Sequence, residues 1–133
     1  MLPEHLYTSY FPTGSNYICN PPVTDTDIDY MYFVYSIEEC TDWLEENGWK
    51  KCGSNGYKQL GWISYRKGKY NLILTDDMNH YNKFEAATEL AKKRNLTRKA
   101  DRIALFHTII GETIPKYNPA LGLENFVNTI LPK

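Results

Sequence analysis

Three aspartates, Asp25, Asp27 and Asp29, stand at every second position on the way into an apolar and aromatic run that ends at Tyr35. Because side chains alternate along a strand, Asp27 and Asp29 would project from one face of its entrance. Two carboxylates so close repel each other once water is partly removed, and a cation between them relieves that repulsion. The spacing therefore favours a cation site, and the alternative is a solvated acidic turn before a strand.

The residues that come next indicate the kind of cation. An EF-hand calcium loop also begins with aspartates at its first, third and fifth positions, but it needs glycine at the sixth and glutamate at the twelfth. This chain has Tyr30 and Ser36 there. Magnesium prefers a few carboxylate oxygens together with water and substrate phosphates, and two such ions can clamp the attacking and leaving oxygens of a phosphoryl transfer. Magnesium is therefore the better interpretation.

A glycine-serine pair upstream fits the same chemistry. Eleven residues separate Ser15 from Asp27, and Gly14 comes directly before Ser15. Glycine lets the backbone approach a phosphate closely, and a serine hydroxyl with adjacent N–H groups can hydrogen-bond the terminal phosphates of a nucleotide, most readily where a helix begins. Gly14 and Ser15 are therefore candidate nucleotide-binding residues.

Together these residues resemble the signature of the DNA polymerase β-like nucleotidyltransferase superfamily. That signature is a hydrophobic residue, glycine, glycine or serine, a spacer, and then aspartate-hydrophobic-aspartate-hydrophobic, often after serine or threonine. Here "GS" at 14–15 is followed by "TDIDY" at 26–30. The segments "NLILTDD" and "AATELAKKRNLTRKADRIALFHTIIG" also resemble small nucleotidyltransferase-like proteins encoded by tailed bacteriophages.

The resemblance implies a minimal core in which one strand carries Asp27 and Asp29 as catalytic ligands of two magnesium ions. The implied reaction transfers a nucleoside monophosphate from a nucleoside triphosphate (NTP) to a hydroxyl, and pyrophosphate leaves. Catalysis would rest mostly on positioning and on neutralising charge. The residues that the resemblance places at the nucleotide are Gly14, Ser15, Thr26 and Asn71.

A third carboxylate, which activates the acceptor hydroxyl in this superfamily, should lie on the strand "KYNLILTDD". When this strand is aligned with the family's pattern, Asn71 takes the place of that carboxylate, and an amide cannot act as a base. Asp76 or Asp77 at the far end of the strand is the alternative catalytic candidate. Alternation puts only Asp77 on the face of Asn71, but it does not choose between the two. Both aspartates are equally well explained as a polar strand exit before a helix.

Two groups of basic residues lie outside the signature. Arg66, Lys67 and Lys69 surround the turn of a predicted hairpin, and a second group flanks the junction between the last two long helices. The second group could hold a triphosphate or an RNA backbone, although a solvated face with helix-end lysines is the simpler explanation. Its members are Lys92, Lys93, Arg94, Arg98, Lys99 and Arg102.

Strand and helix signals predict an α+β fold with a small mixed β-sheet. A strand at 28–35 is followed by a helix at 37–47, which starts with capping-box spacing after Ser36. A short strand at 49–52 and a hairpin that turns at Gly68 complete the sheet. This sheet would form the minimal nucleotidyltransferase core, with helices packed on it.

Two C-terminal helices follow the hairpin. The first covers 81–94, and the second begins after a cap at Thr97 and runs to residue 110. Apolar residues recur at three-to-four spacing in both helices, so each should bury one stripe against the sheet. The inward stripe predicted for the second helix is Ile103, Phe106 and Ile110.

Composition sets the broad class of the protein. The 133 residues fit one domain over 1–133, and a formal net charge of -1 with 42% hydrophobic residues indicates a globular protein without the basic field of a DNA-coating protein. Three widely spaced cysteines indicate reduced thiols. No segment has the pattern of a signal peptide or of a membrane span. We expect a cytoplasmic protein, in the host cytoplasm if it is encoded by a phage.

The sequence thus predicts a magnesium-dependent nucleotidyltransferase whose acceptor is an RNA, protein or small-molecule hydroxyl. Small members of the superfamily often depend on a partner, so the resemblance also allows a homodimer. The alternative is a catalytically weak or inactive binding protein of the same fold and of phage origin, which acts on a host protein or on a defence nucleotide. Asn71 favours the alternative, whereas Asp27 and Asp29 favour the enzyme.

Overall fold

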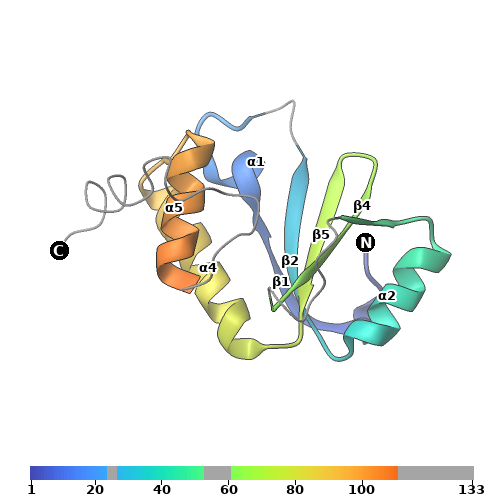
Figure 1. Ribbon diagram of the computed structural model, residues 1–133. Helices are drawn as coiled ribbons and strands as arrows, with labels where there is room; N and C mark the ends of the chain where they lie inside the picture. Colours follow the sequence, from blue (N-terminus) through green and yellow to red (C-terminus); the bar gives the residue numbers. More distant parts are fainter. Residues whose placement is uncertain (24–26, 53–60, 111–133) are drawn as a thin grey trace.

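The computed structural model describes residues 1–23, 27–52 and 61–110, and in this part of the chain five strands form one mixed sheet with helices on both faces (Figure 1). The strand order is β1-β2-β5-β4-β3, in which β2 and β5 run parallel and the other neighbours antiparallel. This confirms the predicted α+β fold. The elements are η1 (Glu4–Leu6), β1 (Tyr7–Thr13), α1 (Gly14–Ile18), β2 (Ile28–Val34), α2 (Ile37–Glu46), β3 (Lys50–Cys52), β4 (Ile63–Lys67), β5 (Tyr70–Thr75), α4 (Met78–Lys93) and α5 (Lys99–Ile110).

One face of the sheet packs against α2 and the N-terminal segment. The apolar side chains of β2 and β5 alternate between the two faces, so every second one points toward α2. Cys40 and Leu44 of α2 are fully buried there, and Trp43 packs against them. Other buried members of this core are Leu2, Leu6, Tyr32, Val34, Trp49, Ile63, Tyr65, Leu72 and Leu74.

Local signals determine where α2 begins and ends. The Ser36 hydroxyl oxygen accepts a hydrogen bond from the Glu39 N–H at 3.3 Å and so caps the first turn. Gly48, with φ of +84°, follows the last turn in the left-handed conformation that glycine adopts readily. The predicted helix at 37–47 therefore agrees with α2 to within one residue.

The other face of the sheet packs against α4. Phe11, Met31, Ile73 and Tyr81 form its buried core. Helix α4 begins at Met78, three residues earlier than predicted, because the Asp77 carboxylate accepts hydrogen bonds from the N–H groups of the first turn. The helix is thereby anchored directly at the end of β5.

Helix α5 lies beside α4 and α1 (Figure 1). Its buried apolar residues are Ala104 and Leu105, and Leu105 packs with Ile18 of α1 and Ala91 of α4. The three residues of the predicted inward stripe are half-buried and line a cavity between α5 and the sheet, as described below, and Phe106 also packs against this cluster. The stripe therefore faces inward as predicted, but the helix docks on α1 and α4.

The remaining features agree with the sequence analysis. The predicted hairpin is formed by β4 and β5, which turn at Gly68 with φ of +60°. The three cysteines are unpaired. None of the helices in the described residues has the length and apolar character that crossing a membrane requires.

Candidate functional site

A row of polar side chains crosses all five strands at the end of the sheet where β2 begins. Thr13 pairs with Asp29, Asp29 with Asn71, Asn71 with Arg66, and Arg66 with Lys50. Residues paired across neighbouring strands project to the same face, which here is the face covered by α4. We call these five residues the polar row. Its members lie far apart in the sequence and are brought together only by the strand register.

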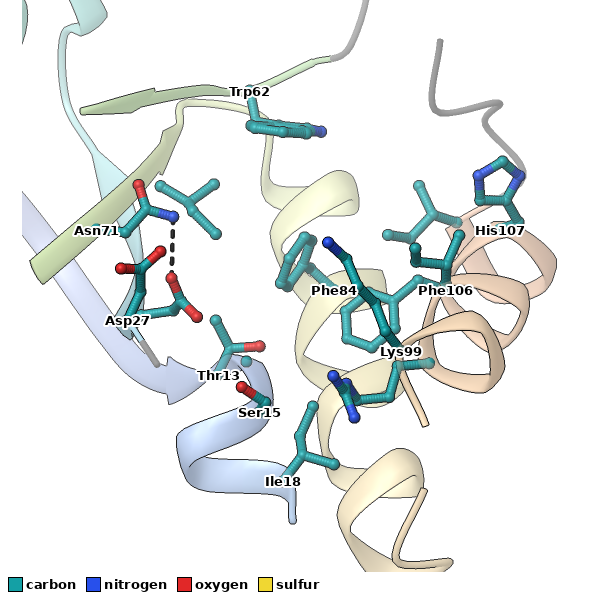
Figure 2. A pocket seen from close by; sticks show the side chains of 16 residues that line it. Thr13, Ser15, Ile18, Asp27, Trp62, Asn71, Phe84, Lys99, Phe106 and His107 are labelled. Atoms are coloured by element: carbon teal, nitrogen blue, oxygen red, sulfur yellow. Dashed lines mark hydrogen bonds between the residues drawn. The ribbon is translucent and has the colours of Figure 1, made fainter. Parts of the chain in front are cut away.

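The two predicted aspartates lie together at this row and have different partners. Asp27 precedes β2, and its Oδ2 lies 2.6 Å from Nη2 of Arg66. Asp29 is the second residue of β2, and its Oδ1 accepts a hydrogen bond of 2.9 Å from Nδ2 of Asn71, drawn as the dashed line in Figure 2. Asn71 thus occupies the position at which a third carboxylate was expected, and its amide donates a hydrogen bond to the carboxylate of Asp29.

The environment of Asp29 raises the pKa of its carboxyl group. Burial is the largest cause, and the neighbouring Asp27 carboxylate adds to it, whereas the hydrogen bond from Asn71 and the charge of Arg66 oppose it. The raised pKa of Asp29 means that, when Asp27 and Asp29 are both ionised, their surroundings do not fully stabilise the negative charge. A cation placed beside Asp27 and Asp29 would offset this.

The backbone of Gly14 lies directly against Asp29. Gly14 has φ of +76°, and a Cβ built there would overlap the Asp29 carboxylate. Any larger residue would therefore displace the carboxylate and also adopt an unfavourable backbone conformation. The predicted proximity of the glycine and the aspartate pair is present, and α1 starts at this contact.

The residue before Gly14, Thr13, connects the end of β1 to α4. Thr13 is buried, and its hydroxyl lies 2.8 Å from the hydroxyl of Thr88 on α4. The Thr88 hydroxyl in turn donates to the Phe84 carbonyl oxygen at 2.9 Å. This buried contact positions the turn into α1 relative to the sheet.

A cavity of about 390 Å³ opens beside the aspartates, between the sheet, α4 and α5 (Figure 2). A volume of this size suits a small organic ligand. The carboxylates lie at the β2 end, apolar and aromatic side chains line most of the rest, and α5 adds Lys99, Arg102 and His107. Its lining residues are Thr13, Gly14, Ser15, Ile18, Asp27, Asp29, Trp62, Asn71, Ile73, Phe84, Lys99, Arg102, Ile103, Phe106, His107 and Ile110.

Aromatic rings surround the apolar part of the cavity. The Phe84 and Phe106 rings meet edge to face with centroids 5.0 Å apart. Figure 2 shows the Trp62 indole facing the same space. Planar rings of this kind can hold a nucleobase by stacking.

Two cationic side chains of α5 reach the cavity. The Lys99 side chain extends into it (Figure 2), and the Arg102 guanidinium is held by the carbonyl oxygens of Leu96 and Thr97 at 3.1 and 2.8 Å. The other basic residues predicted around the helix junction do not line the cavity. Arg98, for example, pairs with Asp101 at 2.8 Å. The predicted basic group therefore does not form a single anion site. Two of its members, Lys99 and Arg102, face the cavity.

The structure does not bring Asp76 or Asp77 to the polar row. Both follow the far end of β5, about 13 Å from Asn71 at the usual rise per strand residue. The Asp77 carboxylate caps α4, with hydrogen bonds of 2.9 and 3.2 Å from the N–H groups of Asn79 and His80. Neither aspartate lines the cavity. Thr26, the remaining predicted nucleotide contact, lies outside the described residues.

Sequence reasoning missed Arg66 as a partner of Asp27, and it missed Trp62. The hairpin contained a signal for the first, because a two-residue turn at Gly68 and Lys69 places Arg66 opposite Asn71. Nothing in the sequence near Trp62 indicates that it lines the same cavity as residues of α4 and α5. That proximity depends on tertiary packing.

The site residues fit one divalent cation better than two. Asp27 and Asp29 can supply carboxylate oxygens to one magnesium ion, which takes its other ligands from water and substrate phosphates. The positive charge of Arg66 already lies beside Asp27, so the site accommodates a cation there. Within the described ranges, no three histidine, cysteine, aspartate or glutamate residues come together as a metal site.

Comparison with known proteins identifies the fold but no family. A solved structure of the conserved protein GrpB from Enterococcus faecalis aligns with a TM-score of 0.56 and 16% sequence identity, covering 95% of this chain and 81% of that chain. The shared architecture is an α+β fold in which helices pack on a mixed sheet. No protein-family model matches the chain, and no curated protein does. At this identity the likeness shows the fold alone.

Proposed function

We propose that the cavity binds a nucleoside triphosphate together with magnesium, and that the protein transfers the nucleoside monophosphate to a hydroxyl acceptor. One observation carries the proposal: Asp27, directly before β2, and Asp29, on β2, line a cavity whose other walls hold a glycine turn, aromatic rings and cations. The carboxylates suit the metal, and the cavity suits the nucleotide.

Each part of the cavity has a role in this proposal. Asp27 and Asp29 hold magnesium, which when bound neutralises the phosphate oxygens. Gly14 leaves the backbone open to a phosphate. Lys99 adds positive charge from α5, and the aromatic rings beside it hold the base.

The proposed reaction replaces one phosphorus–oxygen bond by another and releases a proton. The acceptor oxygen bonds to the α-phosphorus, the bond from that phosphorus to the bridging oxygen of the β-phosphate breaks, and pyrophosphate leaves. Asn71 cannot accept a proton, and Asp27 and Asp29 are the proposed metal ligands, so the acceptor's proton passes to solvent water. The acceptor class, whether RNA, protein or small molecule, remains part of the experiment.

A second candidate is a nucleotide-binding protein that transfers nothing. The specific observation in its favour is Asn71, whose amide donates to Asp29 at the position where a third carboxylate would activate the acceptor. In that case the protein would hold the nucleotide and act through a partner.

The test is incubation with each α-labelled NTP and magnesium, with cellular RNA and protein as acceptors. We expect label transfer and pyrophosphate release with the wild type and neither with the double variant Asp27→Asn, Asp29→Asn. A matched control is the double variant Asp42→Asn, Glu46→Gln, which makes the same charge change at exposed positions outside the cavity.

The outcomes separate the two candidates. Transfer by the wild type and the control alone supports the enzyme. Magnesium-dependent NTP binding without transfer supports the binding protein. If the Asp27, Asp29 double variant bound NTP as tightly as the wild type, neither proposal would stand.

A further inference from the structure

Charge is divided along the polar row. Its negative member, Asp29, lies on β2, the neutral Asn71 lies on β5, and Arg66 and Lys50 lie on β4 and β3. Side chains in one row face the same side of the sheet. A ligand that lies across the row therefore meets carboxylates at one end and cations at the other.

The ion pair between Arg66 and Asp27 is held by charge and not by packing. Nη2 and Oδ2 are 2.6 Å apart, yet the side chains are 48% and 34% exposed. Half-exposed ion pairs contribute little net stability, since water solvates both groups when they part. A divalent cation can therefore displace the Arg66 guanidinium from Asp27 without a large loss of stability.

The strand beside Arg66 offers no carboxylate to receive it once it is displaced. Its register partner on β5 is Asn71, which is neutral and already donates to Asp29. A guanidinium pairs with phosphate as well as with carboxylate through two parallel N–H donors. A phosphate bound over the row would thus be the next available partner.

We propose that Arg66 occupies the cation position on Asp27 in the ligand-free protein and transfers its hydrogen bonds to a phosphate of the bound nucleotide when magnesium takes Asp27. Lys50, in register with Arg66, flanks the same phosphate position. This inference rests on the proposed function and adds an anion-binding group to it. It makes Arg66 a competitor of the metal and a ligand of the nucleotide.

Opposite effects on metal and nucleotide test this role. Arg66→Ala removes the competing charge, so binding of Mn²⁺ alone, used as a probe of the magnesium site and measured by water proton relaxation, should tighten about two- to fivefold. The same variant should bind NTP with magnesium about ten- to a hundredfold more weakly, because charge-assisted hydrogen bonds to phosphate are lost. Arg66→Lys keeps the charge but not the planar fork, so its Mn²⁺ binding should stay near the wild-type value.

Lys67→Ala is the matched control. It makes the same change in net charge one residue further along β4, but Lys67 projects to the opposite face, where its ammonium donates to the Asn47 carbonyl oxygen at 2.8 Å. We expect little change in either affinity. If Lys67→Ala changed the affinities as much as Arg66→Ala, the cause would be the general electrostatic effect of losing one positive charge. The proposed transfer of Arg66 from Asp27 to a phosphate would then be wrong.

The inference and the proposed function can fail separately. If the wild type binds NTP with magnesium but Arg66→Ala weakens both affinities, or leaves Mn²⁺ binding unchanged or undetectable, the exchange is overturned and the proposed function stands. If the wild type shows no magnesium-dependent NTP binding, the proposed function is overturned, and the exchange with it.

Discussion

At the scale of single residues, Asp29 connects folding to binding. Its carboxylate is packed against Gly14, hydrogen-bonded to Asn71 and close to Asp27. Burial and the neighbouring charge raise its pKa, so the ionised form destabilises the ligand-free fold at neutral pH. The proposed magnesium ion would compensate this charge.

Replacement of Asp29 by asparagine should therefore stabilise the ligand-free protein. A carboxyl whose pKa is higher in the folded than in the unfolded state contributes stability that is complete below the unfolded value, near 3.8, and is lost as the pH rises through the folded value. Asp29→Asn removes that loss and keeps an oxygen to accept from Asn71. Its thermal midpoint without divalent cations should exceed that of the wild type at pH 7.

Thermal denaturation followed by circular dichroism at pH 4 and pH 7 measures this effect. The difference between Asp29→Asn and wild type should be larger at pH 7, and added magnesium should raise only the wild-type midpoint. Asp42→Asn, on the exposed side of α2, is the control and should follow the wild type. A lower midpoint for Asp29→Asn at pH 7 would contradict the account.

The sequence predicted the residues of the site whose signal is local. Gly14, Asp27 and Asp29 were identified because their types and spacing are unusual within a short segment. The contact between Arg66 and Asp27 was not identified from the sequence, because it depends on which strands are neighbours in the sheet. Trp62 was missed for the same reason, since its place at the cavity depends on how α4 and α5 pack.

At the scale of elements, predictions succeeded where start and stop signals were strong. The helix at 37–47 has a serine cap and a glycine stop, and the hairpin has Gly68. No range was assigned to β1 (Tyr7–Thr13), because it is an edge strand whose residues are partly exposed and include Pro12. Alternation was too weak there to indicate a strand.

Asp76 and Asp77 allow a test of the α4 cap. Asp77→Ala removes two hydrogen bonds to the first turn and should lower the free energy of unfolding by about 1 kcal/mol. Asp76→Ala makes the same charge change beside it and should stay within about 0.5 kcal/mol of the wild type. Urea denaturation of both variants measures this.

The same pair of variants reports on catalysis. Neither residue lines the cavity, so both variants should bind NTP with magnesium and transfer label like the wild type. Loss of label transfer in Asp76→Ala alone would return the role of third carboxylate to this end of β5. It would also require a site other than the polar row.

At the scale of the whole molecule, one face of the sheet is divided between core and site. The α4 face is apolar at the β5 exit and polar at the β2 entrance, and α5 closes the polar end by packing on α1 and α4. Fold alone does not determine function, so the likeness to GrpB cannot replace this local chemistry. Docking of α5 joins segments distant in sequence, which explains why the buried Leu105 was not among the residues predicted to face inward.

The position of α5 should control nucleotide binding more than metal binding. Leu105 is 1% exposed and packs with Ile18 and Ala91, so Leu105→Ala should lower the free energy of unfolding by about 2–5 kcal/mol. It loosens the helix that carries Lys99 and Phe106 into the cavity. NTP affinity should therefore fall in the folded variant, whereas Mn²⁺ binding, which depends on residues at β2, should change little.

Urea denaturation gives the stability change, and titrations at a temperature where the variant remains folded give the affinities. Thr108→Ala, at an exposed position of the same helix, should stay within about 0.5 kcal/mol of the wild type and keep its NTP affinity. If Leu105→Ala lost stability but bound NTP as well as the wild type, α5 would not be a wall of the nucleotide site. The nucleotide would then have to lie over the polar row alone, held by Arg66 and Lys50 at one end and by the metal at the other.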